Sequence, residues 1–266
     1  MKTFNFILII LAVFLISSCE DVIELNLETG AEKYVVEANL SDSLGTCKVL
    51  ISKTKSFNTP NDFAGQSGAR VTITDSRGNV SSLAEISPGI YQAPALKGVP
   101  GLTYNLRVEI DGNVFTAVSK MPPLVKLEDV YIKELLIFDG VRKMTHVRFT
   151  DPAGKGNYYR FVEYRNGVYN KAVSVINDDL IDGNLVNQLL APREFDDESK
   201  LQVGDKVKVD FLTIDAPVYK YWFSVESGAQ GEGETSAPIN PVTNLNGGAL
   251  GYFSAHTIQS REIIVN

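Results

Sequence analysis

The sequence contains little of three things on which chemistry and association often depend: cysteine, histidine and clustered positive charge. Its 266 residues include 2 cysteines and 2 histidines, and its net charge is −7. Without a lysine or arginine cluster, so acidic a chain is a poor partner for nucleic acid or for anionic headgroups. Neither a zinc-binding His-Glu-x-x-His helix nor a Gly-x-Ser-x-Gly nucleophile turn is present. These absences favour a protein without catalytic residues, metal or cofactor.

The chain also lacks an apolar run long enough to span a membrane. Residues 6–16 are all apolar, but a membrane-spanning helix needs about 20 such residues. With Lys2 before it, the run is typical of a secretory signal peptide over residues 1–18. It ends in Ile-Ser-Ser-Cys, so that Cys19 takes the place of the acylated cysteine of a bacterial lipoprotein. We therefore expect Cys19 to carry acyl chains such as palmitate that anchor the protein. A plain signal peptide followed by a chance cysteine is the alternative.

The second cysteine has no partner within the chain if Cys19 carries lipid. Cys47 lies in the alternating run TCKVLIS together with Val49 and Ile51. This pattern predicts a buried small side chain in preference to a reactive thiol.

The rest of the sequence alternates with the period of two that is typical of β-strands. Turn sequences separate short runs rich in Val, Ile, Thr and Tyr. No helical crossover lies between these runs. The clearest runs are residues 33–40, 47–54, 69–75, 103–110 and 114–119. The pattern predicts an all-β fold of two immunoglobulin-like or fibronectin-like β-sandwich domains. We place these domains at residues 33–120 and 127–266, with a Pro-rich hinge at 121–126 between them.

One corner of the first sandwich has a specific signature. In the stretch LKGVPGLTYNLRVEI, Leu96, Pro100 and Gly101 precede Tyr104, which opens the alternating run 104–110. This order is typical of a tyrosine corner, in which the phenol binds the backbone of the crossing chain.

A single helix is predicted, over residues 216–227 in the second sandwich. Asp215 can cap it, Pro217 suits its first turn, and Gly228 is expected to end it. Its apolar stripe comprises Val218, Tyr221, Trp222 and Val225. Aromatic residues at this spacing usually face a core, and a sugar-stacking platform at Trp222 is the alternative interpretation.

Few other residues suggest chemistry. The stretch NDDLIDGN supplies oxygen ligands that calcium would accept, but it lacks EF-hand spacing, and an ordinary surface turn is the favoured interpretation. Its oxygen-bearing residues are Asn177, Asp178, Asp179 and Asp182. His146 and His256 have no adjacent carboxylate motif and are expected to be solvent-facing or hydrogen-bonded strand residues. The paired carboxylates of a glycosidase leave no local signature in a sequence, so a glycosidase site stays an open alternative.

Several stretches together resemble a known family. They are CEDVIELNL, DPAGKGNYYRF, DDLIDG, GDKVKVDFLTIDAPVYKYW and APINPVTNLNGGALGYFSAH, and the most specific is NPVTNLNGGALGYF at residues 240–253. The chain resembles the domain of unknown function 4249 family of Bacteroidota lipoproteins along nearly all of its mature length. The resemblance implies an outer-membrane lipoprotein, often encoded near a TonB-dependent receptor.

The acidic residues after Cys19 bear on which side of that membrane the protein faces. Residues 19–32 form the expected lipidated tether, and Glu20, Asp21 and Glu24 within it resemble the signal for display on the cell surface. The alternative is that these charges only keep the tether soluble.

We therefore expect a non-enzymatic lipoprotein, exposed at the cell surface, that assists a TonB-dependent transporter in nutrient capture. Two long loops, residues 55–68 and 227–241, are the expected contacts with the transporter, with Phe63 and Glu232 as positions to probe. A structural or adhesive surface module is the first alternative, and an exported hydrolase is the second.

Overall fold

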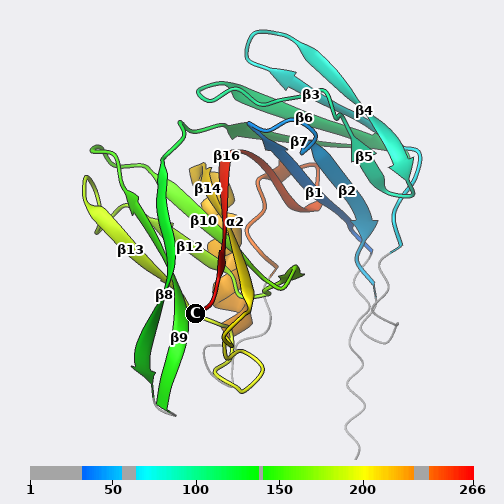
Figure 1. Cartoon of the computed structure of the whole chain (residues 1–266). Coiled ribbons are helices and arrows are strands. Elements are labelled where there is room, and N and C mark those ends of the chain that lie inside the picture. Colours follow the sequence, from blue (N-terminus) through cyan, green and yellow to red (C-terminus); the bar gives the residue numbers. More distant parts are fainter. Residues whose placement is uncertain (1–31, 56–63, 138–139, 231–239) are drawn as a thin grey trace, which may run out of the picture. The chain divides into compact units, whose positions relative to one another are not determined.

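The structure is a computed structural model, and it describes residues 32–55, 64–137, 140–230 and 240–266 (Figure 1). These residues are mostly β, as the alternating pattern predicts. The strands are β1 (Tyr34–Ser41), β2 (Lys48–Lys53), β3 (Arg70–Asp75), β4 (Val80–Ser87), β5 (Ile90–Gln92), β6 (Thr103–Ile110), β7 (Asn113–Lys120), β8 (Leu127–Ile137), β9 (Gly140–Thr150), β10 (Tyr158–Arg165), β11 (Val168–Tyr169), β12 (Ser174–Asn177), β13 (Leu185–Leu190), β14 (Lys206–Ile214), β15 (Leu245–Asn246) and β16 (Leu250–Ile264), and the helix is α2 (Ala216–Gln230).

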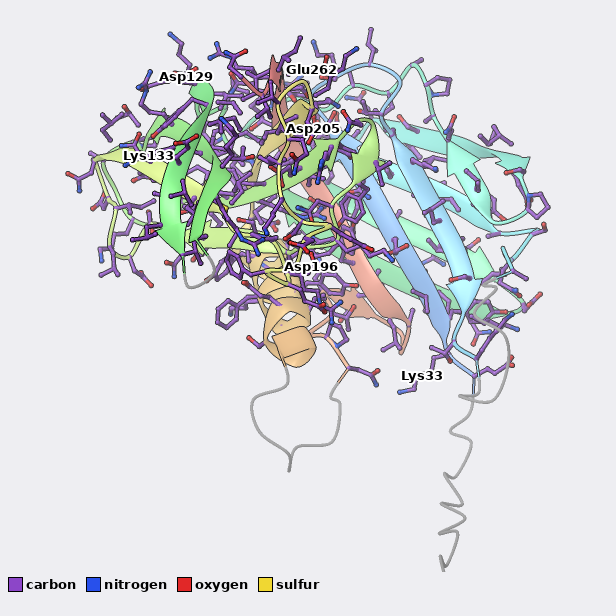
Figure 2. The ribbon with its side chains drawn as sticks, turned by 60° about the horizontal axis from the view of Figure 1, so that its bottom comes forward. Lys33, Asp129, Lys133, Asp196, Asp205 and Glu262 are labelled. Atoms are coloured by element: carbon purple, nitrogen blue, oxygen red, sulfur yellow. The ribbon has the colours of Figure 1, made fainter. Side chains whose placement is uncertain are left out.

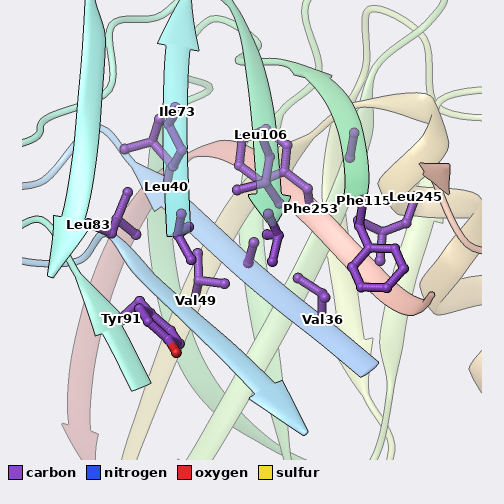
Figure 3. Close-up of a cluster of buried hydrophobic side chains, with 14 of the residues drawn as sticks. Val36, Leu40, Val49, Ile73, Leu83, Tyr91, Leu106, Phe115, Leu245 and Phe253 are labelled. Atoms are coloured by element: carbon purple, nitrogen blue, oxygen red, sulfur yellow. The ribbon is translucent and has the colours of Figure 1, made fainter. Parts of the chain in front are cut away.

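The strands of the first half enclose an apolar core. Strands β1 and β2 supply alternate buried residues such as Val36, Leu40 and Val49, which pack against Ile73 and Leu106 of the strands opposite (Figure 3). Because side chains on a strand alternate between its two faces, the period-two pattern delivers every second residue to this core. All five predicted runs of this half are strands, and Cys47 is buried in the core, as predicted.

The first half contains a tight hairpin turn and the predicted tyrosine corner. Asp111 and Gly112 both have positive φ, of 46° and 75°, and they join β6 to β7 in a two-residue hairpin turn. Tyr104 is buried, and its hydroxyl accepts the backbone N–H of Val99 at 2.6 Å. The tyrosine corner is therefore confirmed, with the phenol tying the crossing chain to β6.

The second half has a core of different composition. A three-stranded sheet in the order β13-β9-β8 shares this core with β10 and β14. Four aromatic rings lie at its centre, and the ring centroid of Phe149 is 4.7 Å from that of Tyr159 and 4.8 Å from that of Phe211. Offset and tilted ring pairs of this kind add to the stabilisation that burial of their area provides.

Strand β16 takes part in both halves (Figure 1). Its first residues pair with β1 in parallel, and its later residues pair with β14 in antiparallel orientation. Gly251 makes the first pairing possible, since any Cβ there would lie 2.1 Å from the carbonyl oxygen of Val36. Residues 121–126 connect the halves without regular structure, with Met121 and Val125 buried. The division into two domains stays a prediction, and β16 crosses its proposed boundary.

Helix α2 covers the outer face of β10 and β14. A third apolar cluster lies beneath it, with Val218 of the helix against Leu212 and Ile214 of β14. Asp215 caps the helix as predicted, because its Oδ1 accepts the N–H of Val218 at 3.1 Å. The predicted end at residue 227 is wrong by three residues, since Gly228 keeps a helical conformation instead of the left-handed one that ends helices. In the described ranges, no helix combines the length and apolarity needed to cross a membrane.

Candidate functional site

A cavity of about 920 Å³ opens in the second half. It lies where the end of β10, the hairpin to β11 and the middle of β9 meet the connection between β13 and β14. Small-molecule sites occupy about 300–1,000 Å³, so the cavity is large enough for a ligand of that class. No motif in the sequence marks this position, because its walls come from segments far apart along the chain.

Two arginines hold the connection that forms one wall of the cavity. Arg142 is buried and donates to the carbonyl oxygens of Phe195 at 3.0 Å and Asp196 at 2.7 Å. Arg165 donates to the carbonyl oxygen of Glu198 at 2.8 Å and pairs with Asp205 at 2.7 Å. Figure 2 shows Asp196 and Asp205, the two labelled acidic residues of this region. A wall fixed by charge-assisted hydrogen bonds is a pre-formed one.

The cavity is lined by charged residues of both signs, together with apolar surface. The charged residues are Lys143, Glu163, Arg165, Lys171, Arg193, Glu194, Asp196 and Glu198. Four cations and four anions leave no dominant sign, which suits a neutral polar ligand. Thr145, 1% exposed, also lines the cavity, and its hydroxyl has no hydrogen-bond partner among the described residues. Neither histidine nor cysteine is among the residues that line the described cavity.

The acidic stretch that resembled a calcium site binds backbone groups. Asp178 is buried, and its Oδ2 accepts the N–H groups of Gly156 at 2.7 Å and Asn157 at 2.9 Å. The Oδ1 of Asp182 accepts the N–H of Gly154 at 2.7 Å. These carboxylates therefore hold the preceding loop, as an Asx-rich turn does. No group of three or more metal-binding side chains is found in the part of the chain that the structure describes.

The two histidines are buried strand residues with hydrogen bonds. Nδ1 of His146 lies 3.2 Å from the carbonyl oxygen of Met144, and Nδ1 of His256 lies 2.9 Å from the hydroxyl of Ser254. The prediction of hydrogen-bonded strand residues is confirmed, and the solvent-facing alternative is wrong because His146 is 7% and His256 is 5% exposed. Burial lowers the pKa of His256 to about 3, and the positive charge of Arg160 adds to the effect.

Trp222 packs against the third apolar cluster, which supports the core interpretation of its position. One face of its ring is covered by Arg160, whose guanidinium carbon lies 3.5 Å from the ring centroid. Tyr221 and Tyr252 meet the same ring edge-on at 5.3 and 5.1 Å. The covered face is not available as a sugar-stacking platform.

Several predicted functional residues lie outside the described residues. They are the lipid-attachment residue Cys19, the acidic residues Glu20, Asp21 and Glu24, and the loop positions Phe63 and Glu232. Their proposed roles stay predictions.

The sequence profile of the family described as Domain of unknown function (DUF4249) matches residues 20–262. The chain belongs to this family. The match starts directly after Cys19 and ends within β16, so the DUF4249 unit includes both cores, the cavity and α2. A comparison with curated proteins finds no match.

Proposed function

We propose that this DUF4249 chain is a lipid-anchored protein of the bacterial outer membrane that captures a nutrient for a TonB-dependent transporter. The cavity of about 920 Å³ carries the capture role, because its walls are fixed by Arg142 and Arg165 and the charged residues that line it have no dominant sign. The Ile-Ser-Ser-Cys sequence that ends at Cys19 supports the anchor. The protein binds its ligand without changing it.

The anchor is tested by replacing its attachment residue. Cells that express the wild type or Cys19→Ser are labelled with a fatty-acid analogue, and the label is followed on the purified chain. We expect label on the wild type alone, together with an unprocessed precursor for Cys19→Ser. Equal labelling of both chains would contradict lipid attachment at Cys19.

Display on the cell surface is tested with protease added to intact cells. If Glu20, Asp21 and Glu24 direct display, the wild type is degraded and the triple alanine variant is protected. Degradation of the wild type only after lysis would place the protein on the periplasmic side instead.

The transporter partner is tested by crosslinking in cells. A photoreactive residue at Phe63 or Glu232 should give one dominant adduct at the mass of a large outer-membrane barrel, since a tethered protein meets its membrane partner at high effective concentration. Val80, an exposed residue on β4, serves as the control position. Adducts to other lipoproteins alone, or none, would favour the structural or adhesive alternative.

The capture role itself is tested on the cavity. Thr145→Val keeps the shape of a buried side chain and removes the hydroxyl without a partner. Ligands that co-purify with the wild-type chain are identified by mass spectrometry and should be lost or reduced in Thr145→Val. A co-purified ligand that is chemically cleaved over time by the wild type would favour the hydrolase alternative.

A further inference from the structure

Arg160 holds a position unlike that of the other arginines in its half of the molecule. It lies in the middle of β10, between Val175 of β12 and Leu212 of β14, and it is half-buried. Its guanidinium carbon lies over the ring of Trp222, at 3.5 Å from the ring centroid. A guanidinium stacked on an aromatic ring is held in one orientation. Its N–H donors lie in the plane of the guanidinium, so they stay free to bind an acceptor beside the ring.

Those donors have no acceptor among the residues that the structure describes. A guanidinium has five N–H donors. Arg142 and Arg165 donate theirs to loop carbonyls, and Arg148 pairs with Asp129 at 3.0 Å. For Arg160, the stack on Trp222 is the contact that the structure gives, and no acceptor from the described ranges lies within hydrogen-bonding distance. A half-buried arginine without an acceptor is unusual, because partial loss of water leaves its donors poorly satisfied.

An acidic residue lies nearby and is also unpaired. Glu37 of β1 is paired in register with Tyr252 of β16, whose ring lies 5.1 Å from that of Trp222. Glu37 is half-buried and, like Arg160, forms no ion pair or side-chain hydrogen bond with any described residue. Burial raises the pKa of its carboxyl, while the charge of Arg160 lowers it. The two charges thus influence each other without contact.

We infer that Arg160 and Glu37, with Trp222 beneath Arg160 and the buried Tyr221 and Tyr252 around that ring, form a binding site for a small monocarboxylate. The fixed fork of Arg160 matches the two oxygens of a carboxylate. The negative charge of Glu37 opposes ligands with more than one negative charge. Sugar acids and amino acids share this chemistry, and Glu37 distinguishes them, since it would repel the first and bind the ammonium group of the second.

This Arg160 site, as we call these five residues, is distinct from the cavity. Its residues lie on the face of β1, β10 and β16 next to α2, and different residues line the cavity. The inference therefore does not depend on lipid attachment, on a transporter or on the ligand of the cavity.

Trp222 makes the site directly observable, because it is the single tryptophan of the chain. The full chain, purified in detergent, is titrated with sodium glucuronate and with leucine while tryptophan emission is recorded. Glucose and leucinamide are the matched probes without a carboxylate. We expect a saturable change with at least one of the two carboxylates and none with its matched probe. An equal response to inorganic phosphate would show an adventitious ion only and would overturn the inference.

Variants then assign the binding to named groups. Arg160→Gln should weaken carboxylate binding by about tenfold or more, the loss expected for charge-assisted hydrogen bonds, and Arg160→Lys should recover part of it. The matched control is Arg148→Gln, which removes an arginine from the other sheet and should leave the affinity unchanged.

Glu37→Gln is a second test of the site, which applies even if the Arg160 variants fold poorly. It should tighten glucuronate binding by removing the opposing charge, and an altered fold alone would not tighten binding. If the ligand is an amino acid, the same substitution should weaken leucine binding by removing the partner of its ammonium group. Unchanged affinity for both probes in Arg160→Gln and Glu37→Gln would overturn the proposed site.

Discussion

The two halves of the molecule differ in the buried side chains that hold their loops. In the first half, tyrosine hydroxyls bind the backbone: Tyr104 accepts the N–H of Val99, and Tyr91 accepts that of Ala69 at 2.9 Å. In the second half, carboxylates do so, with Asp178 on the loop at 156–157 and Asp151 accepting the N–H of Gly183 at 3.1 Å. A tyrosine adds its ring to the core, whereas an aspartate offers more acceptors but no apolar area.

The cores follow the same division. The first is mostly aliphatic, with Val, Ile, Leu and Ala in the majority, and the second has four stacked or tilted rings at its centre. The loops held by carboxylates therefore belong to the half whose core already has four aromatic rings at its centre. Aspartate-rich turns in this fold therefore hold loops in place and need not bind a metal.

The largest expected effect comes from opening the aromatic core. Phe149→Ala should lower the free energy of unfolding by about 3–5 kcal/mol, and Leu106→Ala in the aliphatic core by about 2–5 kcal/mol. Because β16 pairs with both β1 and β14, we expect both variants to shift one common transition in chemical denaturation. Two separate transitions, each moved by one variant, would instead support two independent domains.

Loss of the buried carboxylate of Asp178 should give the next largest effect. Asp178→Ala leaves the N–H groups of Gly156 and Asn157 without their acceptor, at a cost of about 2–3 kcal/mol in unfolding free energy. Asp179→Ala, an exposed residue of the same turn, is the control and should cost under about 0.5 kcal/mol. If calcium raises the melting temperature of the wild type and Asp179→Ala removes that rise, the turn binds the metal after all.

The tyrosine corner should contribute less. Tyr104→Phe keeps the buried ring and removes one hydrogen bond, so we expect a loss of about 0.5–1.5 kcal/mol in denaturant melts. Tyr34→Phe is the control, because its hydroxyl binds Asp111 in contact with solvent and should matter little. Equal effects of the two substitutions would show that the corner adds nothing specific.

The smallest effect concerns Cys47, for which we expect no reaction in the folded protein. Burial raises the pKa of its thiol to about 11, so at pH 8 the thiolate that would react is scarce as well as covered. A thiol reagent should modify Cys47 only under unfolding conditions, as followed by mass spectrometry. Rapid modification of the native chain would mean that the first core opens locally.

Much of the fold could be predicted from short stretches of sequence. Period-two alternation predicts the strands, Asp111-Gly112 predicts the hairpin turn, and Tyr104 predicts the corner, because each of these depends on neighbours close in sequence. The end of α2 was mispredicted because glycine is compatible with a helix as well as with its end. NDDLIDGN was ambiguous, since its acceptors bind N–H groups more than 20 residues away.

The candidate sites could not be predicted in this way. Arg160 and Trp222 are 62 positions apart, and nothing in either local sequence indicates that they stack. The register of Glu37 with Tyr252 joins strands from opposite ends of the chain, and the cavity lies between segments that are separate in sequence. Such contacts depend on strand order, which alternation alone does not specify.

The parallel pairing of β1 with β16 has a consequence for how the chain is made. Val35 pairs with Leu250, so β1, which leaves the ribosome or a membrane translocon long before β16, cannot complete its sheet until β16 has followed. Contacts that distant in sequence close slowly. A chain that must pass unfolded through a membrane gains from this order, because its final structure cannot close while the C-terminal end is still on the side where synthesis takes place.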